Sequence, residues 1–80
     1  MRLRELREDR DLPQKAISAF LNVRQSTYSQ YEGGQRQIPI ALLVRLSEFY
    51  NTSVDYILEL TNEPLPYPRE KQKKSLSYEK

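Results

Sequence analysis

The spacing of apolar residues is the feature of this sequence that most constrains its fold. Apolar positions recur at intervals of three and four residues, and no stretch shows the alternation typical of a half-buried β-strand. The longest periodic segments span only about a dozen residues. The pattern therefore predicts an all-α domain of five short helices.

We expect these helices to cover residues 2–10, 13–20, 25–32, a segment that begins at Pro39 and contains Tyr50, and a segment that follows Ser53 and ends near Leu60. Pro39 suits a first helical turn, where its missing N–H is not needed, and the Ser53 hydroxyl suits a helix cap. The residues expected to face the core are Leu3, Leu6, Ala16, Ile17, Phe20, Leu43, Leu46, Phe49 and Tyr50.

Three of the expected helices end at a short polar residue. Asp11, Asn22 and Asn51 stand where the chain must turn out of a helix. Asn and Asp adopt the left-handed backbone conformation more readily than other residues with a Cβ, although glycine adopts it more easily still. We expect a left-handed residue at each of these three places.

The composition excludes several classes of function. The 80 residues contain no cysteine and no histidine, which removes disulfides, the usual zinc ligand sets and the commonest general base. The acidic run at Glu5, Glu8, Asp9 and Asp11 is typical of a solvated helix face. We expect a protein that is not an enzyme and has no metal or cofactor.

The sequence also lacks the marks of a membrane or secreted protein. No apolar run reaches the roughly 20 residues that span a bilayer, and the first ten residues are charged throughout. We expect a single soluble, cytoplasmic domain.

The charges are distributed unevenly. Residues 1–60 carry eight basic and eight acidic side chains, whereas residues 61–80 carry five basic and three acidic ones. Within the neutral part, residues 13–37 have a net charge of +2 and residues 40–60 a net charge of −2. One end of the domain is therefore more basic than the other, as expected of a surface that contacts an anionic partner.

The segment from Gln25 to Glu32 predicts a helix with an unusual outer face. Tyr28 and Tyr31 share one side of this helix, and the other side carries small residues and amides. An ordinary solvated helix favours Glu and Lys there, whereas amides and hydroxyls are the groups that read the edges of bases. The alternative is a polar helix face with no partner.

The composition changes after Thr61. Residues 62–80 contain three prolines at alternate positions and then a charged, apolar-poor stretch. We expect a domain at residues 1–61 and an extended, flexible tail at 62–80. A basic arm along DNA and a segment that docks on a partner are the alternatives for this tail.

The stretch "LPQKAISAFLNVRQSTYSQYEGGQRQIPIALLVRLSEFYNTSVDYIL" resembles the Cro and phage-repressor family of helix-turn-helix proteins, the lambda repressor-like or XRE type. Gln14, the "STYSQYEGG" segment and the "SVDYIL" ending match the family pattern in order and spacing. With the "LREL" entry, the resemblance covers about residues 2–60.

The resemblance implies a function and a set of site residues. The third helix of such proteins lies in the major groove, with its first exposed residues on bases. The implied base contacts are Gln25, Ser26, Ser29 and Gln30, and the implied phosphate contacts are Gln14, Gln35 and Arg36. We add Lys15 and Arg24 as further candidate phosphate contacts. Gln14 matches a glutamine whose amide and backbone N–H grip a phosphate together.

Further positions are structural by the same resemblance. Arg7 corresponds to a basic residue that pairs with the acid at Glu32, either as a buried pair or as a weaker exposed one. The resemblance also places Val23, Tyr28 and Tyr31 in the core.

The sequence departs from the family pattern at three helix ends. Pro13 and Arg24 stand where a capping side chain is common, and Asn22 replaces a turn glycine.

We therefore expect a sequence-specific transcriptional regulator of double-stranded DNA, most simply a repressor that binds a palindromic operator as a homodimer. Tyr56, Leu58 and Leu60 are candidate dimer contacts, unless they complete the core of the monomer. The alternative function is an antitoxin or regulatory adaptor subunit that acts through a protein partner.

Overall fold

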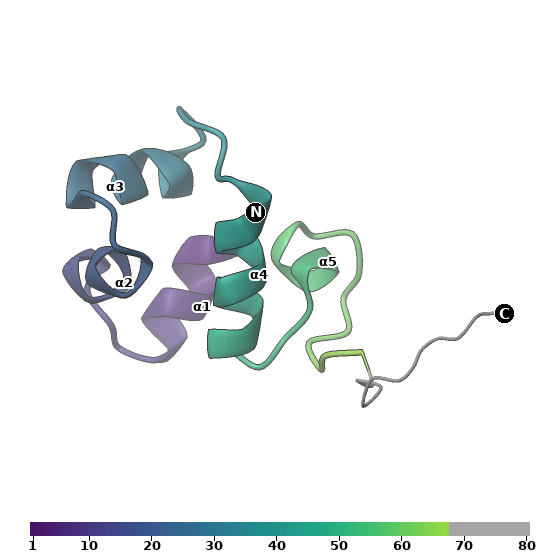
Figure 1. Cartoon of the computed structure of the whole chain (residues 1–80). Helices are drawn as coiled ribbons and strands as arrows, with labels where there is room; N and C mark the ends of the chain where they lie inside the picture. The colour runs from purple at the N-terminus through teal and green to yellow at the C-terminus, as the bar shows by residue number, and fades with distance from the viewer. Residues whose placement is uncertain (68–80) are drawn as a thin grey trace, which may run out of the picture.

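The computed structural model describes residues 1–67, and its helices confirm the all-α, five-helix prediction (Figure 1). The elements are α1 (Leu3–Asp9), α2 (Gln14–Leu21), α3 (Gln25–Gly33), α4 (Ile40–Phe49) and α5 (Val54–Ile57). Helices α2 and α3 form one end of the domain, α1 and α4 lie in its middle, and α5 lies at the other end (Figure 1). None of these helices has both the length and the apolar character needed to cross a membrane.

The expected left-handed helix ends are present. Asp11, Asn22 and Asn51 have φ angles of 55°, 59° and 55°. The sequence did not predict the left-handed Glu59, with φ 65°, because glutamate has no special tolerance for that conformation. Helix α5 is shorter than expected because it ends at Ile57 instead of near Leu60.

The helix starts differ in how well they are capped. The hydroxyl of Ser53 accepts a hydrogen bond from the backbone N–H of Tyr56 at 3.0 Å, as predicted for a cap. Pro13, Arg24 and Pro39 precede α2, α3 and α4 without a capping side-chain hydrogen bond. Pro39 lies one residue before α4 and not within its first turn, where the sequence predicted it.

The core lies between the inner faces of all five helices. Its largest fully buried side chain is Tyr28, which packs edge to face with Tyr31, their ring centroids 6.4 Å apart. The buried apolar residues are Leu3, Ile17, Leu21, Tyr28, Tyr31, Ile38, Leu43, Leu46, Tyr50 and Ile57, and Leu6 and Val23 pack against them. Burial of this aliphatic and aromatic surface is the main stabilising contribution.

Three residues expected in the core lie at the surface. Ala16 is exposed on α2, and Phe20 and Phe49 are 37% and 36% exposed. The two phenylalanine rings instead pack on each other, with their centroids 4.8 Å apart. The helical period identified an apolar side of α2, but Leu21 and the buried Ser18 are the residues that meet the core.

The chain after α5 turns back onto the domain. The hydroxyl of Thr52 donates to the carbonyl of Pro64, and the hydroxyl of Tyr67 donates to Asp55 at 2.5 Å. The remainder of the expected tail, residues 68–80, lies outside the described residues. The predicted boundary at residue 61 stays a prediction.

Candidate nucleic-acid interface

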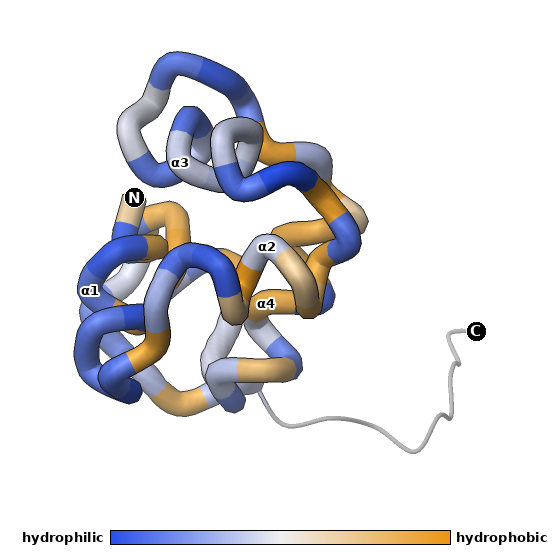
Figure 2. Tube along the Cα trace, turned by 90° about the vertical axis from the view of Figure 1, so that its left-hand side faces the viewer, coloured by the Kyte–Doolittle hydropathy of each residue, from blue (hydrophilic) through white to orange (hydrophobic). Residues whose placement is uncertain are grey.

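Helix α3 has a buried face and a polar exposed face. Tyr28 and Tyr31 are buried, whereas the four residues expected to read bases are exposed: Gln25, Ser26, Ser29 and Gln30. Figure 2 shows the α3 trace in blue and white, in contrast to the apolar α4 beneath it. The exposed face carries amides and hydroxyls, which donate and accept hydrogen bonds as base edges require.

The starts of α2 and α3 lie beside this face. Because Pro13 and Arg24 supply no capping hydrogen bond, the first backbone N–H groups of both helices have no side-chain acceptor there. Lys15 and Arg24 are both exposed at these positions. Uncapped N–H groups and adjacent cations are the elements of a phosphate-binding surface.

The side chain of Gln14 is engaged within the protein. Its Nε2 donates to Glu32 Oε1 at 3.1 Å. The amide expected on a phosphate therefore contacts α3 in this structure, while the backbone N–H of Gln14 stays in the uncapped first turn of α2.

Arg7 and Glu32 form a buried ion pair between α1 and α3. Arg7 Nε and Nη2 donate to the Glu32 carboxylate at 2.6 and 3.1 Å, and Arg7 Nη1 donates to the Leu12 carbonyl at 2.8 Å. The side chains of Arg7 and Glu32 are 11% and 0% exposed. The pair joins the end of α3 to α1. Because both side chains are largely shielded from solvent, it is the buried ion pair and not the exposed one.

The contacts of Glu32 determine its charge state. Burial alone would raise its pKa, but the hydrogen bonds from Arg7 and Gln14 outweigh burial and lower the pKa below 4.5. The same hydrogen bond to Glu32 raises the pKa of Arg7. Both groups are therefore charged at neutral pH.

Two tyrosine hydroxyls lie in the core close to this pair. The hydroxyls of Tyr28 and Tyr50 are buried without a hydrogen-bond partner of normal geometry. Burial, reinforced by the nearby Glu32 carboxylate, raises the pKa of Tyr28 above its usual range and that of Tyr50 to about 12. These hydroxyls are neutral, and burying a hydroxyl without a well-formed hydrogen bond costs free energy.

The loop after α3 folds back along the last turn of that helix. Arg36 Nε donates to Gln30 Oε1 at 3.0 Å. The amide of Gln35 lies so close over Gly33 that a Cβ at that position would overlap it. Gln35 and Arg36, the two loop residues expected on the DNA backbone, thus contact the last turn of α3.

Sequence analysis missed Arg4. Its Nε lies 3.5 Å from Glu32 Oε1, and its side chain is 61% exposed. The signal was its spacing, since Arg4 is one helical turn before Arg7 and shares its face.

The candidate dimer residues are in different surroundings. Leu60 is exposed, Leu58 packs against the core, and Tyr56 lies under the guanidinium of Arg2, 4.3 Å from the ring centroid. Sequence analysis missed a hollow of about 380 Å³ that Leu58 borders, lined by Met1, Gln37, Ile38, Pro39, Ile40, Leu43 and Leu58. Ile40 is 68% exposed at this hollow.

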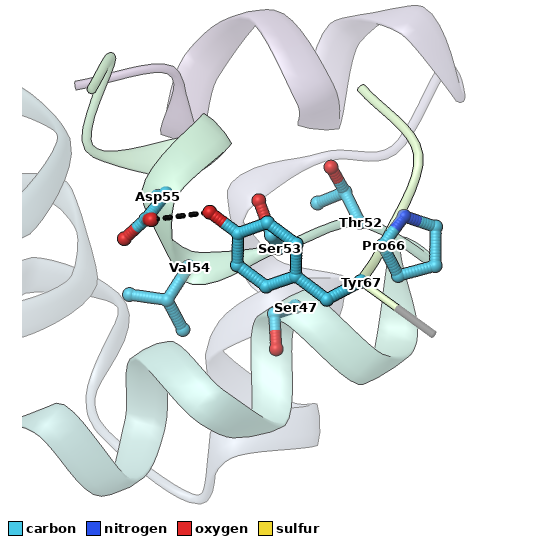
Figure 3. A pocket seen from close by; sticks show the side chains of 7 residues that line it. All are labelled: Ser47, Thr52, Ser53, Val54, Asp55, Pro66 and Tyr67. Carbon is cyan, nitrogen blue, oxygen red and sulfur yellow. Dashed lines mark hydrogen bonds between the residues drawn. The ribbon is translucent and has the colours of Figure 1, made fainter. Parts of the chain in front are cut away.

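A second hollow of about 270 Å³ lies where residues 64–67 pass the start of α5. Figure 3 shows the Tyr67 ring across this hollow, with its hydroxyl directed at Asp55. Ser47 donates to the Val44 carbonyl at 2.7 Å, and the Ser53 hydroxyl caps α5. These hydroxyls are engaged within the chain, and residues 1–67 contain no cluster of acidic side chains suited to a metal ion.

Comparison with known proteins identifies the family. A family model described as helix-turn-helix matches residues 3–57. The chain belongs to this helix-turn-helix family. The resemblance to lambda repressor-like, XRE-type proteins is confirmed, and the family is one of regulators, not of enzymes, as the sequence predicted.

Similar proteins are named as transcriptional regulators. The chain is 38% identical over 65 residues to the uncharacterized HTH-type transcriptional regulator YobD of Bacillus subtilis strain 168, covering 81% of this chain and 58% of YobD. It is 37% identical over 57 residues to the HTH-type transcriptional regulator ImmR of the same strain, covering 71% of this chain and 45% of ImmR. The chain thus spans less than two thirds of these relatives. No solved structure matches it.

Proposed function

We propose that this chain is a sequence-specific double-stranded DNA-binding transcriptional regulator whose α3 enters the major groove. The exposed face of α3 is the observation that carries the proposal. It presents Gln25, Ser26, Ser29 and Gln30 without a bulky charge, on a helix whose opposite face is fixed in the core by Tyr28. Amides and hydroxyls at the start of a rigid helix suit direct contact with base edges.

Phosphate contacts fix such a helix in its groove. The uncapped starts of α2 and α3, with Lys15 and Arg24, suit the strands on either side of α3. Gln14 contributes its backbone N–H, while its amide holds Glu32. Gln35 and Arg36 supply contacts along the loop after α3.

The same proposal includes a homodimer on a palindromic operator, because one module of this size makes few base contacts. The apolar hollow between Pro39, Ile40 and Leu58 is the surface that we assign to the second copy. It begins where the loop from α3 enters α4. A copy seated there must hold its own α3 about one helical turn of DNA, roughly 34 Å, from the first. An Ile40→Asp substitution should abolish dimerisation in sedimentation experiments while leaving the helical content unchanged.

Repression is the simplest outcome of such binding. A dimer that covers a promoter blocks transcription by occluding it. We also propose that the protein is cytoplasmic, as expected from the sequence.

The adaptor reading has its own supporting observation. Phe20 and Phe49 stack at the surface between α2 and α4, and Val44 is exposed on α4. An antitoxin or adaptor subunit could hold a protein partner on this apolar surface. DNA binding would then be secondary.

Two substitutions test the proposed function. Gln25→Ala should weaken binding to a selected operator by about 1–3 kcal/mol and leave binding to random DNA unchanged. Lys15→Ala should weaken binding to both kinds of DNA. It should also reduce the slope of log K against log salt concentration by about 1, because one phosphate contact is lost. Equal effects of both variants on operator and random DNA would contradict the assignment of α3 as the reading helix.

A further inference from the structure

Gln30 has one of its two hydrogen-bonding groups occupied by Arg36. The Arg36 Nε donates to Gln30 Oε1 at 3.0 Å. A guanidinium only donates, whereas a glutamine amide has an acceptor oxygen and a donor NH₂ group. The contact therefore turns the amide oxygen toward Arg36 and leaves Nε2 for another partner.

The backbone brings Arg36 to this position. Gly34 ends α3 in the left-handed conformation, with φ 82°, and the chain reverses beside the last turn. The backbone N–H groups of Gln35 and Arg36 both donate to the Gln30 carbonyl, at 3.0 and 3.3 Å. Since the backbone of Arg36 is tied to the residue that its side chain contacts, the side-chain bond closes only a small loop and adds no backbone torsions to those already fixed.

We propose that Arg36 is a positioning residue that turns the donor group of Gln30 toward the base, selecting guanine over adenine. The inference rests on the proposed function, because it concerns how α3 reads DNA. An unrestrained glutamine pairs with adenine by accepting from N6 and donating to N7. Arg36 occupies one of the two lone pairs of Oε1 and turns this oxygen toward the loop, so we expect Gln30 to present its NH₂ donors to the base, and guanine offers two acceptors, N7 and O6.

The charge of Arg36 acts in the same direction. A cation beside Gln30 favours the base edge with the larger number of acceptors and disfavours an edge that presents an amino group. The Nη groups of Arg36 remain available for a phosphate, so one residue would orient a base-reading amide and contact the DNA backbone.

The first experiment compares base preferences. The wild type and the variants Gln30→Ala, Arg36→Ala and Arg24→Ala each select from random duplex DNA. The position that loses its preference in Gln30→Ala is the base read by Gln30. At this position the wild type should select guanine, and Arg36→Ala should shift the guanine-to-adenine ratio toward adenine by roughly tenfold, the scale of one bidentate contact.

Arg24→Ala is the matched control, since it removes an exposed cation at the other end of α3. It should weaken binding to all sequences and leave the base preferences unchanged. The proposal is overturned if the wild type selects adenine at the Gln30 position, or if Arg36→Ala weakens all sequences alike as the control does.

A second experiment tests the contact in the free protein. In ¹⁵N NMR spectra, the Arg36 Nε–H should be protected from solvent exchange, and Gln30→Ala should remove this protection. Protection that survives Gln30→Ala, or that is absent in the wild type, overturns the proposal. The wild type could also select no DNA sequence while Gln30→Ala removes the protection of the Arg36 Nε–H. That result would contradict the proposed function and leave only the contact between Arg36 and Gln30 established.

Discussion

The guanidinium of Arg7 and the carboxylate of Glu32 form two hydrogen bonds, 2.6 and 3.1 Å long, around a Glu32 side chain that is fully buried. The contact joins α1 to the end of α3, and Gln14 of α2 donates a further hydrogen bond to the same carboxylate. Three helices thus meet at one carboxylate near the end of α3. We expect the position of α3, the helix that we assign to DNA, to depend on this charge pair.

Removal of the cation should destabilise the domain strongly. Arg7→Met leaves the Glu32 charge buried with weaker compensation, so the free energy of unfolding should fall by about 3–5 kcal/mol. Arg4→Met is the control, since that side chain is largely exposed and should contribute less than about 1 kcal/mol. Urea denaturation measures both, and similar losses for the two variants would contradict the dominant role of Arg7.

Stability should depend on pH through Glu32. The folded state lowers the pKa of Glu32 below 4.5, so the unfolded chain binds its proton first as the pH falls. The stabilisation is complete above about pH 4.5 and is lost as the pH falls through the folded-state pKa. The Glu32→Gln variant should have a lower free energy of unfolding than the wild type at neutral pH. Its free energy of unfolding should then fall less than that of the wild type as the pH is lowered from about 5 through the folded-state pKa of Glu32. Parallel pH profiles for variant and wild type would show that Glu32 is not the titrating group.

The buried hydroxyl of Tyr28 should be dispensable for folding. Because it has no hydrogen-bond partner of normal geometry, Tyr28→Phe should leave stability unchanged or raise it by about 1 kcal/mol. Thermal denaturation is the measurement, with Tyr31→Phe as a control at a neighbouring buried ring. A loss of more than about 1 kcal/mol would indicate that the hydroxyl bonds to Glu32 in solution.

Stability and DNA affinity should respond in opposite directions at Arg24. Its backbone has the extended conformation of a helix cap, φ −69° and ψ 147°, but its side chain makes no capping bond. Arg24→Ser should therefore stabilise the domain by about 1 kcal/mol relative to Arg24→Ala. Both variants lack the cation and should bind all DNA sequences more weakly. Equal melting temperatures for the two variants would contradict the capping argument.

The order of the helices and three of their ends followed from local chemistry. Asp11, Asn22 and Asn51 marked helix ends because the left-handed conformation is a property of a single residue. The helical period likewise predicted which face of α3 is exposed. The polar stretch after Thr61 gave no sign of the hydrogen bond between Tyr67 and Asp55.

Side-chain partners were the part that the sequence could not supply. The period of α2 shows an apolar side but not how far it turns toward the core, so Ala16 and Phe20 were misplaced and Leu21 was missed. The bonds from Gln14 to Glu32 and from Arg36 to Gln30 depend on how helices and loops meet in space. Such distances are set by tertiary packing and not by spacing along the chain.

Selection of random duplex DNA by the purified protein at near-physiological salt, followed by sequencing of the bound fraction, tests the central claim most directly. Enrichment of a palindrome with half-sites about 10 base pairs apart is the predicted result, because two copies of α3 would then occupy successive major grooves on one side of the duplex. Recovery of unenriched DNA, bound only in a salt-sensitive manner, would contradict a sequence-specific regulator and favour a protein partner.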